Sequence, residues 1–254
     1  MSSADQYLRA IVHKYRVDNG AFSPVRSVVP FLLPSLRTWG GAFLEGVMPS
    51  GSFAKGTAVN ISTDIDLFLS LSPATPDTLK VIYQTLFNRL SSDGFSPKCQ
   101  NVSVGAIVNG YSVDLVPARR INLQSHDHSL YKQKQDTWTK TNINRHIQRI
   151  VTSNRTDEIV VMKIWSKQHL LDIPSFYLEM LTIEACKNRP YGNLSSNISA
   201  CFEYVRDYIV SARFIDPSNT ANAISDDLTI EEKKKLAAAA AQARNTRLWI
   251  DIVK

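Results

Sequence analysis

Residues 64–71, Asp-Ile-Asp-Leu-Phe-Leu-Ser-Leu, form the segment that most constrains the fold of this chain. Apolar side chains occupy every second position, and alternation with a period of two predicts a β-strand. Side chains two residues apart lie on the same face of a strand, so Asp64 and Asp66 project together while the alternating apolar residues face a core. The segment therefore predicts a sheet that carries two neighbouring carboxylates.

This pair of carboxylates favours a metal site. Two unpaired carboxylates side by side repel one another and raise each other's pKa. A divalent cation removes this cost, and hard oxygen ligands suit Mg²⁺ or Mn²⁺. Gly51 and Ser52 lie shortly upstream, where a turn could aim backbone N–H groups at an anion and glycine would let a phosphate come close. A phosphate site beside paired carboxylates is typical of metal-assisted phosphoryl or nucleotidyl transfer.

A third acid follows in a predicted hairpin. Asn109-Gly110 separates the apolar segments 102–108 and 111–116, and Asn-Gly between two such segments predicts a tight hairpin turn. Asp114 alternates with apolar residues in the second segment. If that strand lies beside residues 64–71, three carboxylates converge, and the third can help to hold two metals or take a proton from an attacking hydroxyl.

Helical periodicity predicts helices in both halves of the chain, whereas strands are predicted in the first half only. Predicted helices cover 2–16, 25–37, 78–90, 144–151, 158–170, 176–186, 196–210 and 231–253, and predicted strands cover 42–48, 64–71, 102–108 and 111–116. The last helix begins with a capping box formed by Thr229 and Glu232. Residues 118–137 are polar and irregular. We therefore expect an α+β chain with a core at 1–125 and a helical half at 126–254.

Composition indicates the setting of the protein. The 29 Lys and Arg residues exceed the 23 Asp and Glu residues by six, a mild excess that fits a protein handling phosphates. Three widely spaced cysteines make no disulfide framework and no Cys-x-x-Cys zinc pair, which favours a reducing compartment. No apolar segment approaches the ~18 residues of a membrane span. We expect a cytoplasmic protein without a membrane partner.

Three motifs resemble the polymerase-β-type nucleotidyltransferase superfamily: Gly51-Ser-x-x-x-Gly-Thr, then Asp64-Ile-Asp-Leu-Phe, and later Ser112-Val-Asp-Leu-Val-Pro. The resemblance implies a mixed sheet with flanking helices, and an active site in the cleft between this core and a helical half. It implies that Asp64, Asp66 and Asp114 are catalytic residues that bind Mg²⁺ or Mn²⁺. It also implies that Gly51 and Ser52 hold the phosphates of a nucleotide.

The second half is similar to the 2′,5′-oligoadenylate synthetases and the CD-NTases, which make cyclic oligonucleotides in bacteria. The similar features are Lys163-Ile-Trp, then a helix that opens after a proline and carries an aromatic residue before Leu178-Glu-Met-Leu, and the segment Ile215-Asp-Pro with Asn219 to Asn222. The resemblance implies that four residues bind the nucleotide: Lys163, Lys167 and Ser175 hold its triphosphate, and Phe176 stacks on its base. Lys163 and Lys167 share one helix face because they are four residues apart.

The expected function is therefore a nucleotidyltransferase that makes cyclic or linear oligonucleotide second messengers from ATP, with or without other NTPs, in antiviral or anti-phage signalling. One alternative is a template-independent RNA nucleotidyltransferase of the CCA- or poly(A)-adding type, and another is a catalytically inactive binding module. The sequence leaves open the base specificity, the linkage, the ring size, a nucleic-acid activator and the oligomeric state.

Overall fold

The computed structural model describes residues 2–20, 23–61 and 64–254 and divides the chain into two compact units. We call them the sheet unit, Asp18–Gly56 with Thr63–Ile147, and the helical unit, Met1–Val17 with Thr57–Ser62 and Gln148–Lys254. The division therefore differs from the single boundary expected after residue 125. The N-terminal helix falls in the helical unit because its Leu8 and Ile11 are buried in that unit's apolar core.

The sheet unit is built around a mixed sheet. Its strands are β1 (Leu44–Pro49), β2 (Ile65–Leu71), β3 (Lys98–Cys99), β4 (Val104–Val108), β5 (Tyr111–Arg120), β6 (His128–Lys132) and β7 (Thr137–Thr141). Five run in the order β1-β2-β5-β4-β3, while β6 pairs with β5 and β7 with β6. Strands β2 and β5 run parallel to one another, whereas β1 is antiparallel to β2 and β4 is antiparallel to β5. The predicted strands and their adjacency are confirmed.

The predicted hairpin turn is also confirmed. Strands β4 and β5 pair antiparallel from Val108 and Tyr111 outward. Asn109 and Gly110 both have positive φ, 51° and 81°, the backbone that a two-residue hairpin turn requires and that Asn and Gly accept most readily.

The expectation of an irregular segment at 118–137 was wrong. Strand β5 continues to Arg120, and β6 and β7 form a second hairpin. Strand β6 buries His128, whose ring lies 2.8 Å from the Ser70 hydroxyl in β2. The polar composition conceals this strand because a paired imidazole and hydroxyl here occupy positions that apolar residues usually fill.

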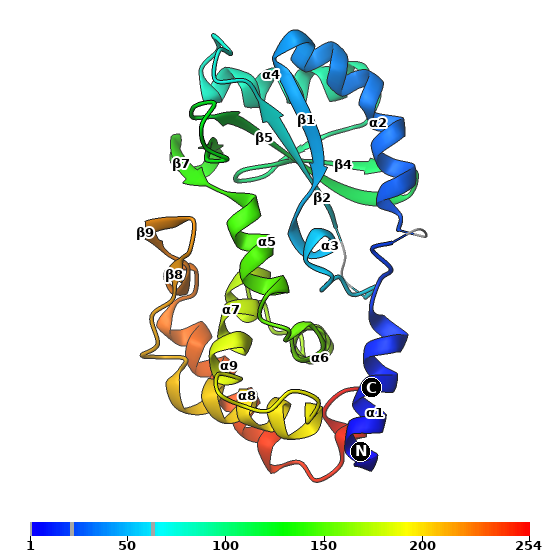
Figure 1. Ribbon diagram of the computed structural model, residues 1–254, viewed down its shortest axis with the longest axis vertical. Coiled ribbons are helices and arrows are strands. Elements are labelled where there is room, and N and C mark those ends of the chain that lie inside the picture. The colour runs from blue at the N-terminus through cyan, green and yellow to red at the C-terminus, as the bar shows by residue number, and fades with distance from the viewer. Residues whose placement is uncertain (1, 21–22, 62–63) are drawn as a thin grey trace. The chain divides into compact units, whose positions relative to one another are not determined.

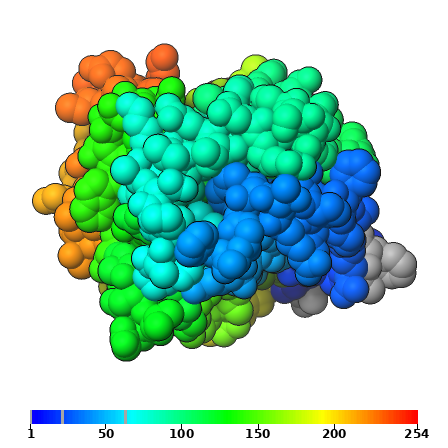
Figure 2. Space-filling model, turned by 90° about the horizontal axis from the view of Figure 1, so that it is seen from above, coloured from blue at the N-terminus to red at the C-terminus, as the bar shows by residue number. Residues whose placement is uncertain are grey.

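Helices α2 (Val25–Gly40) and α4 (Leu79–Ser92) contact one another and the sheet, as Figure 1 shows. Figure 2 looks on this unit from above, with the blue segment of α2 near the cyan-to-green segment of α4. The short elements are η1 (Gly41–Phe43), α3 (Gly51–Lys55) and η2 (Gln133–Gln135), and α5 (Ile143–Val151) follows β7. The mixed sheet with flanking helices confirms the predicted α+β class.

The helical unit contains α1 (Ser3–Tyr15), α6 (Thr156–Gln168), α7 (Ser175–Ala185), α8 (Leu194–Tyr208), α9 (Ile230–Asn245), the turns η3 (Ile224–Asp227) and η4 (Trp249–Asp251), and a small hairpin of β8 (Ile215–Asp216) and β9 (Asn219–Ala223). The capping box of Thr229 and Glu232 is confirmed. Helix α9 ends eight residues before the predicted 253, because the chain turns to bury Val253, whose carbonyl accepts a hydrogen bond from the Tyr7 hydroxyl. No helix in the described ranges has the length and apolar character needed to span a membrane.

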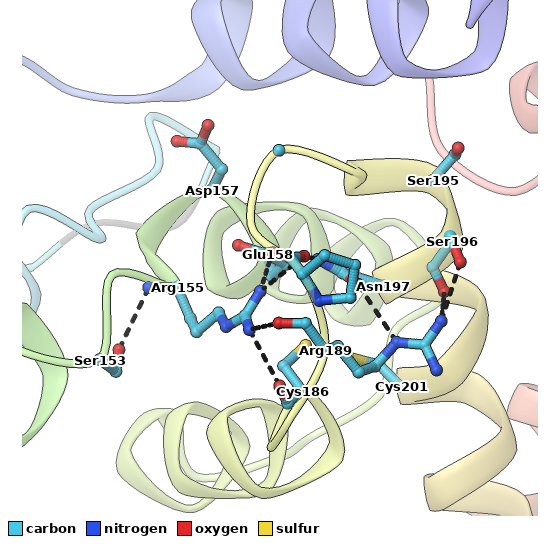
Figure 3. Close-up of polar contacts among 12 residues, drawn as sticks. Ser153, Arg155, Asp157, Glu158, Cys186, Arg189, Ser195, Ser196, Asn197 and Cys201 are labelled. Atoms are coloured by element: carbon cyan, nitrogen blue, oxygen red, sulfur yellow. Dashed lines mark hydrogen bonds and ion pairs between the residues drawn. The ribbon is translucent and has the colours of Figure 1, made fainter. Parts of the chain in front are cut away.

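A buried polar network joins α6, α7 and α8, as Figure 3 shows. The Arg155 guanidinium donates to the Glu158 carboxylate at 3.1 Å and to the carbonyl of Cys186 at 3.0 Å. Asn197 donates to the same Glu158 oxygen at 2.8 Å. Both members of the ion pair are nearly fully buried, so each depends on the other for charge compensation.

Candidate active site

The sheet register places two of the three predicted catalytic acids directly side by side. Asp66 in β2 is the register partner of Asp114 in β5, so the two residues are parallel neighbours on adjacent strands. Asp64 lies one residue before β2 and is exposed. The carboxyl group of Asp64 is close enough to Asp114 to influence its ionisation. The sheet therefore brings all three acids to one edge.

The Gly51 turn lies directly against Asp66. Gly51 has a φ of +54°, a backbone conformation that residues with a side chain rarely adopt. A Cβ atom at this position would also overlap the Asp66 carboxylate. The Ser50 N–H donates to the Asp66 carbonyl at 2.8 Å and fixes the approach of the turn. Ser52 follows in α3 and is half-buried. The turn predicted to hold phosphates is thus packed on a predicted metal ligand, and only glycine fits there.

Asp114 has a strongly perturbed carboxyl group. Burial and the negative charge of Asp64 raise the pKa of Asp114 to about 6, while a hydrogen bond from Gln100 acts in the opposite direction. The Gln100 Nε2 atom lies 2.7 Å from Asp114 Oδ1. A carboxyl group with a pKa near neutrality can exchange a proton at ordinary pH, as general acid–base catalysis requires.

Replacing Asp114 with asparagine is expected to stabilise the metal-free protein at neutral pH. With a pKa raised from 3.8 to about 6, the Asp114 carboxyl group binds its proton more tightly in the folded state. Its ionised form therefore destabilises the fold above about pH 6, and this cost disappears as the pH falls toward about 4. Calorimetry in EDTA should show a gain of a few degrees near pH 7.5 that vanishes near pH 4. A gain of equal size at both pH values would contradict this assignment.

The acids fit a divalent cation by their donor chemistry. Carboxylate oxygens are the ligands that Mg²⁺ and Mn²⁺ prefer. The like-charge repulsion between Asp64 and Asp114 is a cost that a cation removes. Within the described part of the chain, no three His, Cys, Asp or Glu side chains have the arrangement of a metal site. Joint metal ligation by Asp64, Asp66 and Asp114 stays a prediction.

In the helical unit, Lys163 belongs to a buried network. Its Nζ atom lies 2.7 Å from Glu179 Oε1 and 3.1 Å from Thr57 Oγ1, and Thr57 Oγ1 lies 2.9 Å from the same Glu179 oxygen. Lys163 is 5% exposed, and Glu179 and Thr57 are fully buried. This network explains why a lysine lies in an apolar helix. A contact of Lys163 with triphosphate stays a prediction.

The other predicted nucleotide-binding residues lie on α6 and α7. Lys167 is exposed, one helical turn after Lys163. Ser175 is the exposed first residue of α7 and follows Pro174. Phe176 is half-buried and packs against a cluster formed by Ile150 of α5, Ile159 of α6 and Ile183 of α7. The two residues at the start of α7 are therefore neighbours, and their nucleotide contacts stay predictions.

Sequence reasoning missed Gln100, Thr57 and Glu179. Glu179 could have been found, because it is the one acid among the buried residues of α7, as Lys163 is the one base among the buried residues of α6. Lone opposite charges in two apolar helices favour a buried pair. Gln100 gives no comparable signal, because its role depends on a turn that approaches Asp114 from β3.

No protein-family model matches the chain. A curated relative, the cyclic AMP-AMP-AMP synthase of Escherichia coli strain MS 115-1, is 26% identical in a match over 196 residues, and the match covers 69% of this chain. The match covers 61% of the relative, so the chain spans less than two thirds of the relative's length.

Solved structures show a shared fold. The structure of E. coli MS115-1 CdnC with ATP has a TM-score of 0.78 and 22% identity, with 95% of this chain and 90% of that chain covered. The CD-NTase CdnG of Bradyrhizobium diazoefficiens with GTP has a TM-score of 0.76 and 13% identity, covering 96% and 92%. Poly(U) polymerase structures share the fold as well. The predicted nucleotidyltransferase fold and the resemblance to the CD-NTases are confirmed.

Proposed function

We propose that this protein is a nucleotidyltransferase that joins ATP, alone or with a second NTP, into a cyclic or linear oligonucleotide. A ribose hydroxyl of one nucleotide attacks the α-phosphorus of another, the new phosphodiester bond forms, and pyrophosphate leaves. The observation that carries the proposal is the packing of the Gly51 turn on Asp66, which is itself in register with Asp114. Phosphate-binding backbone and paired carboxylates then meet at one place.

Each proposed role follows from the chemistry of the residue. Gly51 and Ser52 hold the phosphates of the donor nucleotide through backbone and hydroxyl groups. Asp114, with its pKa raised to about 6 by burial and by Asp64, accepts the proton of the attacking hydroxyl. Lys163, Lys167 and Ser175 steady the triphosphate, and Phe176 stacks on the base. Catalysis in this scheme consists mainly of positioning and charge neutralisation.

Asp64, Asp66 and Asp114 would hold Mg²⁺ or Mn²⁺. When bound, the cation would neutralise charge on the transferring phosphoryl group. We further infer that the oligonucleotide is a second messenger in cytoplasmic antiviral or anti-phage signalling. The 26% identity to a cyclic AMP-AMP-AMP synthase supports the cyclic oligonucleotide product.

The second candidate is a template-independent RNA nucleotidyltransferase. It is favoured by the fold shared with poly(U) polymerases. Labelled NTPs with Mg²⁺, incubated with and without an RNA acceptor, separate the two functions. The proposed function requires short products and pyrophosphate without RNA. Label that enters only added RNA would overturn it in favour of the second candidate.

Replacing Phe176 with alanine is expected to weaken ATP binding about 5–150-fold, because one base–aromatic stack contributes ~1–3 kcal/mol. Phe176→Tyr keeps the aromatic face and should retain the affinity. ATP affinity by calorimetry and the urea midpoint should be measured together, because Phe176 also packs on isoleucines. Lower stability with unchanged ATP affinity would show that Phe176 only packs in the core.

A further inference from the structure

The side chain of Gln100 is held at both ends of its carboxamide. Its Nε2 donates to Asp114 Oδ1 at 2.7 Å, and its Oε1 accepts from the Ser103 hydroxyl at 2.8 Å. An ionised carboxylate only accepts hydrogen bonds, so the NH₂ group must face Asp114. Ser103 is buried, which fixes the far end of the amide. Gln100 is thus a rigid donor aimed at one oxygen of Asp114.

The turn that carries Gln100 is fixed by Tyr83 of α4. Gln100 N–H donates to the Ser103 carbonyl at 3.0 Å and closes the turn between β3 and β4. The Tyr83 hydroxyl lies 2.8 Å from the carbonyl oxygens of both Gln100 and Ser103 and accepts from Gln100 N–H at 3.0 Å. Tyr83 is 2% exposed. A core side chain of α4 therefore sets the position of the Gln100 backbone.

Gly105 makes room for this contact. Gly105 in β4 is the register partner of Asp114. A Cβ atom on Gly105 would lie 2.8 Å from Gln100 Nε2 and 3.2 Å from Asp114 Oδ1. No positive φ is involved, so steric space rather than backbone conformation is what favours glycine here. The Gln100 amide can therefore reach the Asp114 carboxylate across β4 because position 105 has no side chain.

We propose that Gln100 is a positioning residue for Asp114, and that the absence of a side chain at Gly105 leaves the space that the Gln100 amide needs. The terminal torsion of an aspartate is broad, so its rotamer alone does not fix the plane of its carboxylate. The bond from Gln100 to Oδ1 fixes that plane and gives Oδ2 a defined direction. The proposal rests on the proposed function, in which Asp114 acts on the reacting nucleotide.

The first test removes the amide. Gln100→Ala should lower kcat by about 10–100-fold, the usual effect of losing a group that orients a metal or catalytic ligand. KM for ATP should change by less than about threefold, because the phosphates are bound by other residues. The thermal midpoint should stay near that of the wild type, because Gln100 is exposed. Gln100→Ala with wild-type kcat would overturn the proposal, as would a lower midpoint with unchanged kcat in the folded fraction.

The second test keeps the Gln100 side chain but obstructs its contact with Asp114. Gly105→Ala adds a methyl group that collides with the Gln100 amide, whereas Gly46→Ala in β1 of the same sheet meets nothing within 4 Å. Gly105→Ala should lower kcat as Gln100→Ala does, and Gly46→Ala should not. In the double variant Gln100→Ala/Gly105→Ala, the two effects should be clearly less than additive, because both act through one contact. Full additivity would contradict a shared cause.

A third measurement does not depend on turnover. Mn²⁺ binding in the presence of the α,β-methylene analogue of ATP can be followed by electron paramagnetic resonance of free Mn²⁺. Gln100→Ala should weaken Mn²⁺ binding about tenfold, and unchanged affinity would overturn the proposal. If the wild type makes no product from any NTP, the proposed function fails, and the Mn²⁺ titration alone decides the role of Gln100. If the wild type is active and the Gln100 variant equals it in rate and in Mn²⁺ affinity, only the positioning role fails.

Discussion

Replacing Asp66 with asparagine is expected to lower product formation by about 10²–10³-fold or more, while the fold survives. Asparagine has nearly the same shape, so the Gly51 turn that packs on this side chain can remain in place. The substitution removes one negative charge from a pair that lies in register across two strands. One carboxylate charge fewer beside Asp64 and Asp114 should keep the thermal midpoint at or above that of the wild type.

The matched control for this prediction is Asp172→Asn. Asp172 is an exposed acid of the helical unit, so its substitution should leave the rate unchanged. Pyrophosphate release and thermal unfolding are measured for both variants. Asp64→Asn should behave like Asp66→Asn. Wild-type turnover in the Asp66 variant would contradict a catalytic role for the acids at this edge of the sheet.

Replacing Lys163 with methionine is expected to lower the free energy of unfolding by about 3–5 kcal/mol, because the buried carboxylate of Glu179 loses its ion pair with the Lys163 ammonium. Glu179 has 0% exposure, so water cannot replace the lost partner. Urea unfolding measures the loss.

Lys167→Met is the control for this substitution, since Lys167 lies on the same helix one turn away and is exposed. Its stability should change by less than about 0.5 kcal/mol. The double variant Lys163→Met/Glu179→Leu should regain much of the loss, because replacing a whole buried pair with apolar residues is often neutral. A Lys163 variant as stable as the Lys167 variant would show that the buried pair contributes little.

Much of the sheet unit could be predicted from local patterns. The alternation of apolar and polar residues predicted β2, and Asn109-Gly110 predicted the β4–β5 hairpin, because both signals depend on neighbours in the sequence. The convergence of Asp66 and Asp114 followed from one assumption, that their strands are adjacent, and the register confirms it. Local periodicity thus placed the acids on their strands, whereas their convergence also required the pairing of β2 with β5.

The features that were missed depend on contacts between distant residues. Strand β6 buries His128 against Ser70, 58 residues away, and nothing in the local sequence shows that this imidazole has a partner. The role of Gln100 depends on Tyr83, Ser103 and the absence of a side chain at Gly105. Gln100 and Ser103 lie in a turn, and His128 begins a short strand, so hydrophobic periodicity gives no signal for any of the three.

The most direct test of the proposed function is mass spectrometry of the products that the purified protein makes from ATP and Mg²⁺ without RNA. The account predicts products whose masses correspond to two or more linked AMP units, with pyrophosphate released in step with each bond formed. The Asp66→Asn protein should make none of them. Unchanged ATP after incubation with each NTP mixture, or the same products from the Asp66→Asn protein, would contradict the account.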